Sequence, residues 1–112
     1  MKERGRVRDI GNARLTYEAI DILGDDQVRA IVELTNDPAL ALKVIRHALS
    51  SGRNAITASK RVVAENLREL IALQGATGCS LLYEAACAAS IPVVRVLETH
   101  FSGEAVLRIE GI

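Results

Sequence analysis

The sequence predicts an α/β protein built on a parallel sheet, and three observations lead to this fold class. Residues 30–34 and 54–57 are short apolar stretches of the kind that forms strands, the first rich in β-branched side chains. Residues 37–52 between them repeat apolar side chains at helical spacing. A second helical stretch after residue 60 leads to another strand candidate at residues 80–83. Consecutive strand–helix–strand units form parallel sheets with right-handed crossovers.

Composition places the chain among globular proteins and argues against several partners. The 112 residues are 49% hydrophobic and 25% charged but only 3% aromatic, so we expect an aliphatic core. The formal net charge is +0, which gives no reason to expect nucleic acid or an anionic membrane as a partner. No apolar run approaches the ~20 residues of a membrane helix, so we expect a soluble, cytoplasmic protein. Cys79 and Cys87 lack metal-ligand spacing and are expected to be buried, reduced thiols.

The first third of the chain is predicted to hold a loop, a short helix and a strand. Residues 1–14 are expected to form a loop. Thr16 is the expected cap of a short helix that Gly24 ends, and residues 25–27 have turn chemistry. The run at 30–34 is almost continuously apolar, which is typical of a strand buried on both faces of a sheet.

The helix over residues 37–52 has the clearest boundaries in the sequence. Asp37 is a favourable N-cap, and Pro38 suits the first helical position because its missing N–H needs no partner there. Gly52 supplies the left-handed residue that ends a helix. One apolar stripe is expected to be buried: Ala41, Val44, Ile45, Ala48 and Leu49.

A second amphipathic helix follows the strand at 54–57. Arg61 and Glu65 stand one turn apart on its outer face and are expected to pair weakly, and Gly75 and Gly78 bracket its end. Its buried face is predicted to contain Val63, Leu67, Leu70 and Ile71.

The last third of the chain is predicted to contain the third strand of the first sheet, then a helix and a strand of another sheet. The strand at 80–83 ends at Glu84, and Ser90 is the expected cap of a helix with Pro92 in its first turn. That helix is expected to bury Val93, Val94 and Leu97. Leu107 and Ile109 alternate with Arg108 and Glu110, as in a strand with one solvent-exposed face, and the strand predicted at 105–110 is expected to join another sheet.

Polar side chains follow each of the three predicted parallel strands. Thr35 and Asn36 follow the first, residues 57–60 follow the second, and Glu84 follows the third. Open α/β sheets bind ligands at the carboxyl ends of their strands, so this cluster fits a phosphorylated or sugar-bearing ligand. Plainer alternatives remain open for each: a satisfied turn at Thr35 and Asn36, a solvated Lys60, and a half-buried, partnered or merely strand-end Glu84. His47 and His100 have no ligand-spaced neighbours and are expected to be solvated or locally bonded.

The glycines of this chain never form G-x-G-x-x-G or a P-loop. Those motifs supply the backbone N–H groups that hold a dinucleotide's pyrophosphate. If a dinucleotide binds here, the part that holds its pyrophosphate is therefore not in this sequence.

Several motifs, in order and spacing, resemble those of homoserine dehydrogenase. They are Val32-Glu33-Leu34-Thr35, Asn54-Ala55-Ile56-Thr57-Ala58-Ser59-Lys60, Tyr83-Glu84-Ala85-Ala86, Ile91-Pro92-Val93-Val94 and Ile109-Glu110-Gly111-Ile112. The resemblance implies NAD- or NADP-dependent interconversion of L-homoserine and L-aspartate 4-semialdehyde in threonine, methionine and isoleucine biosynthesis. It also implies a dimer. The chain would be an internal segment that is inactive alone, with residues 1–88 forming part of a Rossmann NAD(P)-binding domain and 89–112 beginning the α+β substrate and dimerisation domain.

The same resemblance implies roles for particular residues. Thr35 and Lys60 would contact the cofactor, and Lys60 would also lie near the substrate. A sodium ion would be held by Glu84 and by the backbone carbonyls of Cys87, Ala89 and Ile91. The family's general acid/base lysine would lie beyond the last residue of this chain.

Three positions depart from the family pattern. Ser59 stands where the family usually has asparagine, and Cys87 stands where valine is usual. Ala89-Ser90 replaces a glycine pair, and non-glycine residues disfavour positive φ. Two alternatives to the homoserine dehydrogenase assignment remain: a non-catalytic α/β association module, and a fragment of a related NAD(P)-dependent dehydrogenase.

Overall fold

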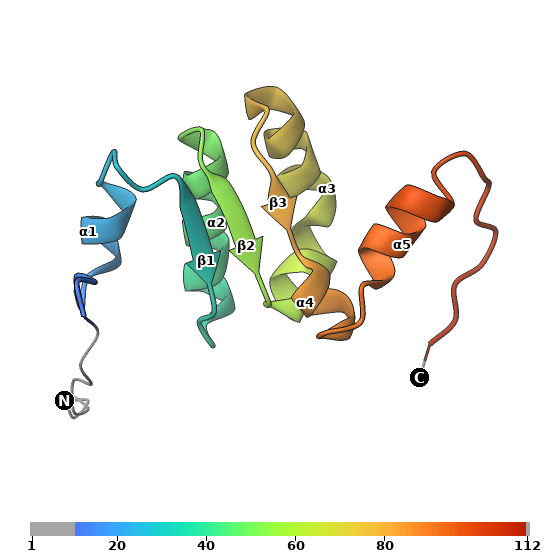
Figure 1. Ribbon diagram of the computed structural model, residues 1–112, viewed down its shortest axis with the longest axis horizontal. Coiled ribbons are helices and arrows are strands. Elements are labelled where there is room, and N and C mark those ends of the chain that lie inside the picture. Colours follow the sequence, from blue (N-terminus) through green and yellow to red (C-terminus); the bar gives the residue numbers. More distant parts are fainter. Residues whose placement is uncertain (1–10, 112) are drawn as a thin grey trace.

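The computed structural model describes residues 11–111 of the chain (Figure 1). Eight elements follow one another: α1 (Ala19–Leu23), β1 (Ala30–Glu33), α2 (Pro38–Ser50), β2 (Asn54–Thr57), α3 (Lys60–Thr77), β3 (Leu81–Leu82), α4 (Glu84–Ala88) and α5 (Val93–His100). Most of the predicted loop at 1–14 lies outside the described residues, and 11–14 contain no helix or strand.

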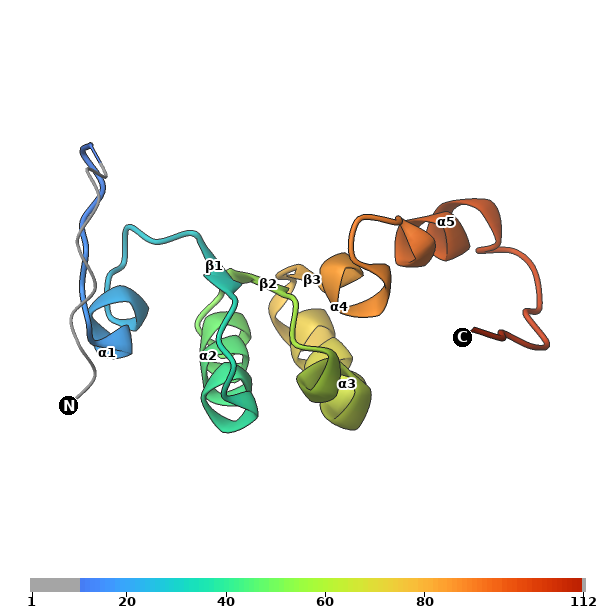
Figure 2. The same cartoon turned by 90° about the horizontal axis from the view of Figure 1, so that it is seen from below.

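The three strands form one parallel sheet in the order β1-β2-β3. Strand β1 pairs with β2 over four residues, from Ala30↔Asn54 to Glu33↔Thr57, and Ala55 and Ile56 pair with the two residues of β3. Helices α2 and α3 both lie against the same face of this sheet (Figure 2). The predicted α/β class with a parallel βαβαβ unit is confirmed.

The core lies between the sheet and these two helices, and it is aliphatic as expected. All five stripe residues predicted for α2 are buried, and Ile45 and Leu49 are fully enclosed. Helix α3 contributes Val62, Val63 and Leu70. Leu67 and Ile71 were also predicted to be buried, but Leu67 is half-buried and Ile71 is 41% exposed. The face of α3 is thus rotated slightly from the predicted one, toward Val62.

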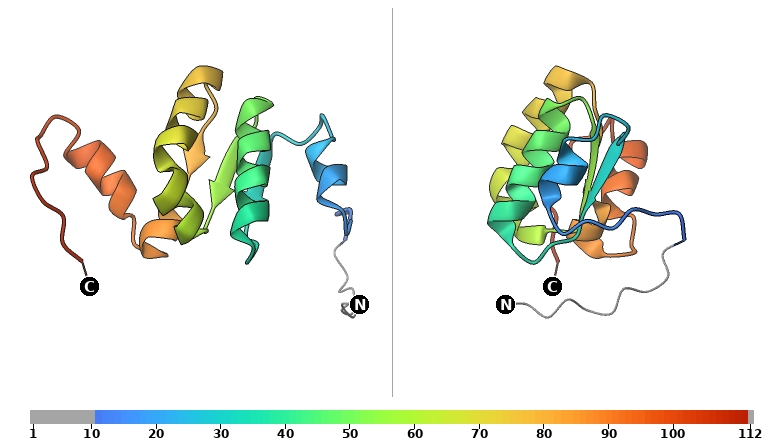
Figure 3. Two further views of the ribbon diagram at one scale, coloured as in Figure 1. Left: turned by 180° about the vertical axis from the view of Figure 1, so that it is seen from behind. Right: turned by 90° about the vertical axis from the view of Figure 1, so that its left-hand side faces the viewer.

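The opposite face of the sheet is exposed at β1, whereas Ile56 and Leu82 line a cavity together with residues of α5. The side chains of β1 alternate, with Ile31 and Glu33 buried and Val32 58% exposed. Leu82 on β3 is likewise 52% exposed. The prediction that β1 is buried on both faces was therefore wrong for this structure. Helices α2 and α3 cover one face of the sheet, and α5, on the other side, lies beyond β3 and not over β1 (Figures 1 and 3).

The predicted helix ends are mostly confirmed. Asp37 caps α2 by accepting hydrogen bonds from the N–H groups of Ala39 at 2.9 Å and Leu40 at 3.3 Å. Gly52 (φ +75°) and Gly78 (φ +71°) follow α2 and α3 in the left-handed conformation. Helix α1 ends at Gly24 as expected. Its N-cap is Glu18 instead of Thr16, whose hydroxyl accepts the Glu18 N–H.

Two ion pairs lie on the outer surfaces of the helices, one between α2 and α3 and one within α3. Arg46 on α2 donates two hydrogen bonds of 2.6 Å to Glu69 on α3, and this bonding lowers the pKa of the Glu69 carboxyl. The predicted Arg61–Glu65 pair forms at 2.8 Å. Both pairs are exposed, so each adds little to stability.

The C-terminal part differs from the prediction in three ways. The strand predicted at 80–83 forms only at Leu81–Leu82, and a short helix that was not predicted, α4, begins at Glu84. Helix α5 begins at Val93 with Pro92, not Ser90, at the N-cap, and it buries none of its residues completely. Residues 105–110 form no strand, and Leu107 is 94% exposed, because no second sheet is present among the described residues to pair with them. The predicted boundary between residues 88 and 89 stays a prediction.

No helix within residues 11–111 is both long enough and apolar enough to cross a membrane.

Replacing Asp37 by Ala removes the cap of α2, and we expect a loss of about 1 kcal/mol in the free energy of unfolding. Urea unfolding monitored by circular dichroism measures this loss. Asp37→Asn is the matched control, because asparagine caps helices as well as aspartate does. An Asp37→Ala variant as stable as the Asn variant would contradict the role of this cap.

Candidate functional site

The carboxyl ends of the strands meet at one edge of the sheet, as predicted (Figure 1). Thr35 lies two residues after β1, Lys60 is the first residue of α3, and Glu84 is the first residue of α4. Thr35 and Lys60 are exposed and Glu84 is half-buried. Lys60 makes no hydrogen bond or ion pair through its side chain with other residues of the described part.

A buried carboxylate connects two of these strand ends. Glu33 is only 3% exposed. Its Oε1 accepts hydrogen bonds from the Thr35 N–H at 2.6 Å and the Thr35 hydroxyl at 2.8 Å. Its Oε2 accepts one from the Thr57 hydroxyl at 2.6 Å, and Thr57 Oγ1 in turn accepts the Ser59 N–H at 3.0 Å. The turns after β1 and β2 are therefore parts of one hydrogen-bond network.

Sequence reasoning missed Glu33, which we placed in an apolar run. A signal was present, since Glu33 is two residues from Ile31 and thus shares its face in a strand. The residue opposite it in the register, Thr57, has a hydroxyl that donates to a carboxylate. The register itself, however, is not visible in one strand's sequence.

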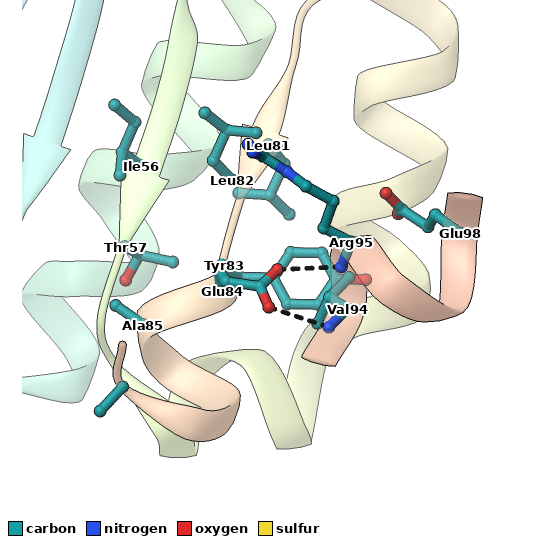
Figure 4. Close-up of a pocket in the computed structure, with 11 residues that line it drawn as sticks. Ile56, Thr57, Leu81, Leu82, Tyr83, Glu84, Ala85, Val94, Arg95 and Glu98 are labelled. Atoms are coloured by element: carbon teal, nitrogen blue, oxygen red, sulfur yellow. Dashed lines mark hydrogen bonds between the residues drawn. The ribbon is translucent and has the colours of Figure 1, made fainter. Parts of the chain in front are cut away.

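A cavity of about 330 Å³ opens beside the ends of β2 and β3 (Figure 4). Its walls combine apolar side chains of the sheet with polar groups from α4 and α5. The lining residues are Ile56, Thr57, Leu81, Leu82, Tyr83, Glu84, Ala85, Ala89, Val94, Arg95 and Glu98. A cavity with apolar walls and a few charged groups has the character of a small-molecule site.

Glu84 holds the start of α5 in place. Its two carboxylate oxygens accept the N–H groups of Val94 at 2.9 Å and Arg95 at 3.2 Å (Figure 4). These amides belong to the first turn of α5 and have no acceptor within the helix, and a negative charge is favourable at this end of a helix. Of the alternatives left open by the sequence, the structure therefore shows a half-buried Glu84 with partners.

Tyr83 lies next to this carboxylate in the cavity wall. Burial raises the pKa of its phenol above the ordinary value, and electrostatic interactions with Glu98, Cys87 and Glu84 raise that pKa further.

The residues predicted to hold sodium lie in α4 and in the turn that follows it. Among the described residues, no group of three or more His, Cys, Asp or Glu side chains comes together as metal ligands. The predicted site depends instead on three backbone carbonyls, and one of these, Ile91, accepts the Val93 N–H at 2.8 Å. Ala89 has φ +53° and ψ −108°, a conformation that glycine adopts far more readily.

The cysteine and histidine side chains do not line this cavity. Cys79 is half-buried, but Cys87 is exposed, so the expectation of two buried thiols was wrong for Cys87. His100 is locally bonded as expected, to the Thr99 hydroxyl at 2.8 Å, whereas His47 is bonded to the carbonyl of Leu23 in α1 at 3.2 Å.

Replacing Ala89 by Gly relieves the strain of its positive φ, and we expect stability to rise by about 1 kcal/mol. Ala88→Gly is the matched control: it lies one residue earlier, within α4, and there glycine costs about 1 kcal/mol. Urea unfolding of both variants tests this difference. A loss of stability at both positions would mean that Ala89 does not hold this conformation.

Comparison with known proteins identifies relatives of one kind. No family model matches the sequence. Homoserine dehydrogenase of Bacillus subtilis is 30% identical over 98% of this chain, and that of Lactococcus lactis is 36% identical over 88%. The corresponding protein of Mycobacterium tuberculosis is 33% identical over 95%. The chain spans only about a quarter of the length of these curated relatives, between 22% and 26%.

A solved structure agrees with the fold. A protein of Archaeoglobus fulgidus, provisionally assigned as a homoserine dehydrogenase, superposes with a TM-score of 0.69 over 77% of this chain and 27% of its own. Its sequence identity is 23%, so this match concerns the α/β fold alone. The resemblance carried by the sequence motifs is confirmed by the relatives: over nearly its whole length, the chain is related to one segment of the homoserine dehydrogenases.

Proposed function

We propose that this chain forms the second half of the NAD(P)-binding domain, and the beginning of the substrate domain, of a cytoplasmic homoserine dehydrogenase. The activity would be interconversion of L-homoserine and L-aspartate 4-semialdehyde in the biosynthesis of threonine, methionine and isoleucine. The observation that supports this most is the edge of the sheet where Thr35 and Lys60 follow neighbouring parallel strands. Dinucleotides bind at such an edge in open α/β sheets.

The residues of this edge suit a cofactor and a small polar substrate. Thr35 would contact NAD or NADP from the end of β1. Lys60, exposed and without a protein partner in the described part of the chain, would offer its positive charge to both cofactor and substrate. The nicotinamide cofactor supplies the hydride acceptor or donor of the reaction when bound. A fixed cation at that place favours negative charge developing on the substrate oxygen.

The oxygens predicted to hold sodium already have hydrogen-bond donors. Both oxygens of Glu84 accept amide hydrogens from α5, and Ile91 accepts the Val93 N–H. Oxygen ligands of this kind suit a hard cation, and each of these oxygens keeps a further lone pair, so the amides of α5 would share Glu84 with a bound ion. The sodium site stays a prediction, and we assign no step of the reaction to it.

Lys60→Ala tests the role of the proposed cofactor lysine. The test enzyme is a Bacillus subtilis homoserine dehydrogenase in which this chain replaces the matching segment. We expect kcat to fall by roughly two orders of magnitude, as on loss of one preorganised electrostatic group. Arg61→Ala is the matched control, because Arg61 is the next cation along α3 and pairs with Glu65 on the outer surface. Near-normal turnover of Lys60→Ala, or an equal loss in Arg61→Ala, would sink the assignment.

The alternative of an association module is favoured by one observation, the exposed apolar side chains on the face of the sheet opposite α2 and α3. Val32 and Leu82 expose more than half of their surface there, and Leu34 beyond β1 is 70% exposed. The outer edge of β1 has no strand partner among the described residues. Exposed apolar patches and unpaired strand edges both promote association with another chain. A symmetric dimer is the simplest closed arrangement.

We therefore predict that this chain alone forms a dimer and does not bind a nicotinamide cofactor, since its sequence lacks a glycine-rich pyrophosphate loop. Light scattering at micromolar concentration measures the mass, and NADPH fluorescence measures binding. Val32→Lys should favour the monomer by placing a charge on the apolar face. Leu107→Lys, in the exposed C-terminal segment, should leave the mass unchanged. A monomeric parent chain, or enhanced cofactor fluorescence, would count against this prediction.

A further inference from the structure

We propose that Glu33 is a positioning residue, whose carboxylate holds the turn of Thr35 and the turn of Lys60 in one arrangement. This inference rests on the proposed function, because those two residues are the ones proposed to contact NAD or NADP. Glu33 is one of only three buried polar or charged residues among those described, with Arg53 and Thr57. Its carboxylate accepts hydrogen bonds from the turn after β1 and from Thr57 at the end of β2.

The position of Glu33 leaves little of it for direct contact with a ligand. The residue is 3% exposed and shares the face of Ile31, two residues earlier. It does not line the cavity shown in Figure 4, although it borders a smaller one of about 140 Å³ between α1 and β1. An effect of Glu33 on a ligand would therefore pass mainly through the groups that it bonds.

On the β1 side, Glu33 fixes Thr35 by two bonds. One Oε1 atom accepts both the backbone N–H at 2.6 Å and the hydroxyl at 2.8 Å. Backbone and side chain of Thr35 are thus held by the same oxygen, immediately before Asp37 caps α2. Hydrogen bonds to an ionised acceptor are the stronger kind, so this turn is well fixed.

On the β2 side, the network reaches Lys60 through the chain. The Thr57 hydroxyl donates to Glu33 and accepts the Ser59 N–H at 3.0 Å. Ser59 is the N-cap of α3, yet its side chain makes no capping bond. The bond at the Ser59 backbone therefore sets the direction in which α3 starts, and Lys60 is the first residue of that helix.

A positioning role and a merely structural role predict different results. If Glu33 only stabilised the core, weakening its bonds would loosen α2 and α3 together with the turns. If it couples the turns, removing the Thr57 hydroxyl on β2 changes the turn of Thr35 after β1, while the helices stay protected. Thr57→Ser keeps the hydroxyl and rescues the coupling.

Amide hydrogen exchange, measured by NMR on the 112-residue chain, distinguishes the two roles. Thr57→Val should speed exchange at Thr35 and Ser59 by about tenfold, the effect of losing one hydrogen bond. Thr57→Ser should restore wild-type exchange, and Glu33→Gln should speed it at both turns. Glu65→Gln, on the outer surface of α3, is the control without effect. Amides in the middle of α2 and α3 should keep their protection in every variant.

The inference is overturned if Thr35 exchanges at the wild-type rate in Thr57→Val. It is also overturned if α2 and α3 lose protection as much as the turns do, or if Thr57→Ser behaves like Thr57→Val. Because no cofactor is present, these outcomes do not bear on the proposed dehydrogenase activity. An unaffected Lys60→Ala enzyme would instead overturn the proposed function while leaving the coupled turns in place.

Discussion

The hydrogen bond between Glu33 and Thr57 is the interaction on which the polar edge of this structure depends. The two residues are direct partners in the parallel register of β1 and β2. A carboxylate this deeply buried is costly unless its oxygens are bonded, and here both are. No buried side-chain polar atom lacks a partner within the described residues. The cost of burial is thus met by groups from the two turns, and those turns become ordered as a consequence.

The aliphatic layer beneath the sheet gives this network its rigid support. Ile45 and Leu49 of α2, with Val62 and Leu70 of α3, are fully enclosed between the helices and the strands. Smaller polar contacts align the far end of the sheet: Asn54 Oδ1 accepts the Ser80 N–H at 2.9 Å, and Gln74 Oε1 accepts the Leu81 N–H at 2.6 Å. The register of β2 and β3 is therefore set at one end by side-chain amides and continues to the end that carries Glu84.

Local signals in the sequence predicted the helices and strands of the sheet well. Features that depend on tertiary contacts were predicted less well. Asp37, Pro38 and Gly52 act within one helix, so their effect is visible in the sequence itself. The bare face of β1 was not predicted, because a run such as 30–34 has the same composition whether or not a second layer covers it. The strand expected at 105–110 needs a partner sheet that the described residues do not contain. Thr35 and Lys60 were placed at the correct edge, but Glu33, which joins their turns, depends on the register between two strands.

A double-mutant cycle between Glu33 and Thr57 tests the central interaction most directly. Urea unfolding of Glu33→Gln, Thr57→Val and the double variant gives the coupling energy of the pair. We expect about 1.5 kcal/mol or more, as for a hydrogen bond to a buried charged group. The exposed Arg61–Glu65 pair, measured in the same way, should give only about 0.3–0.5 kcal/mol. A Glu33–Thr57 coupling no larger than that of the surface pair would contradict the central role of this hydrogen bond.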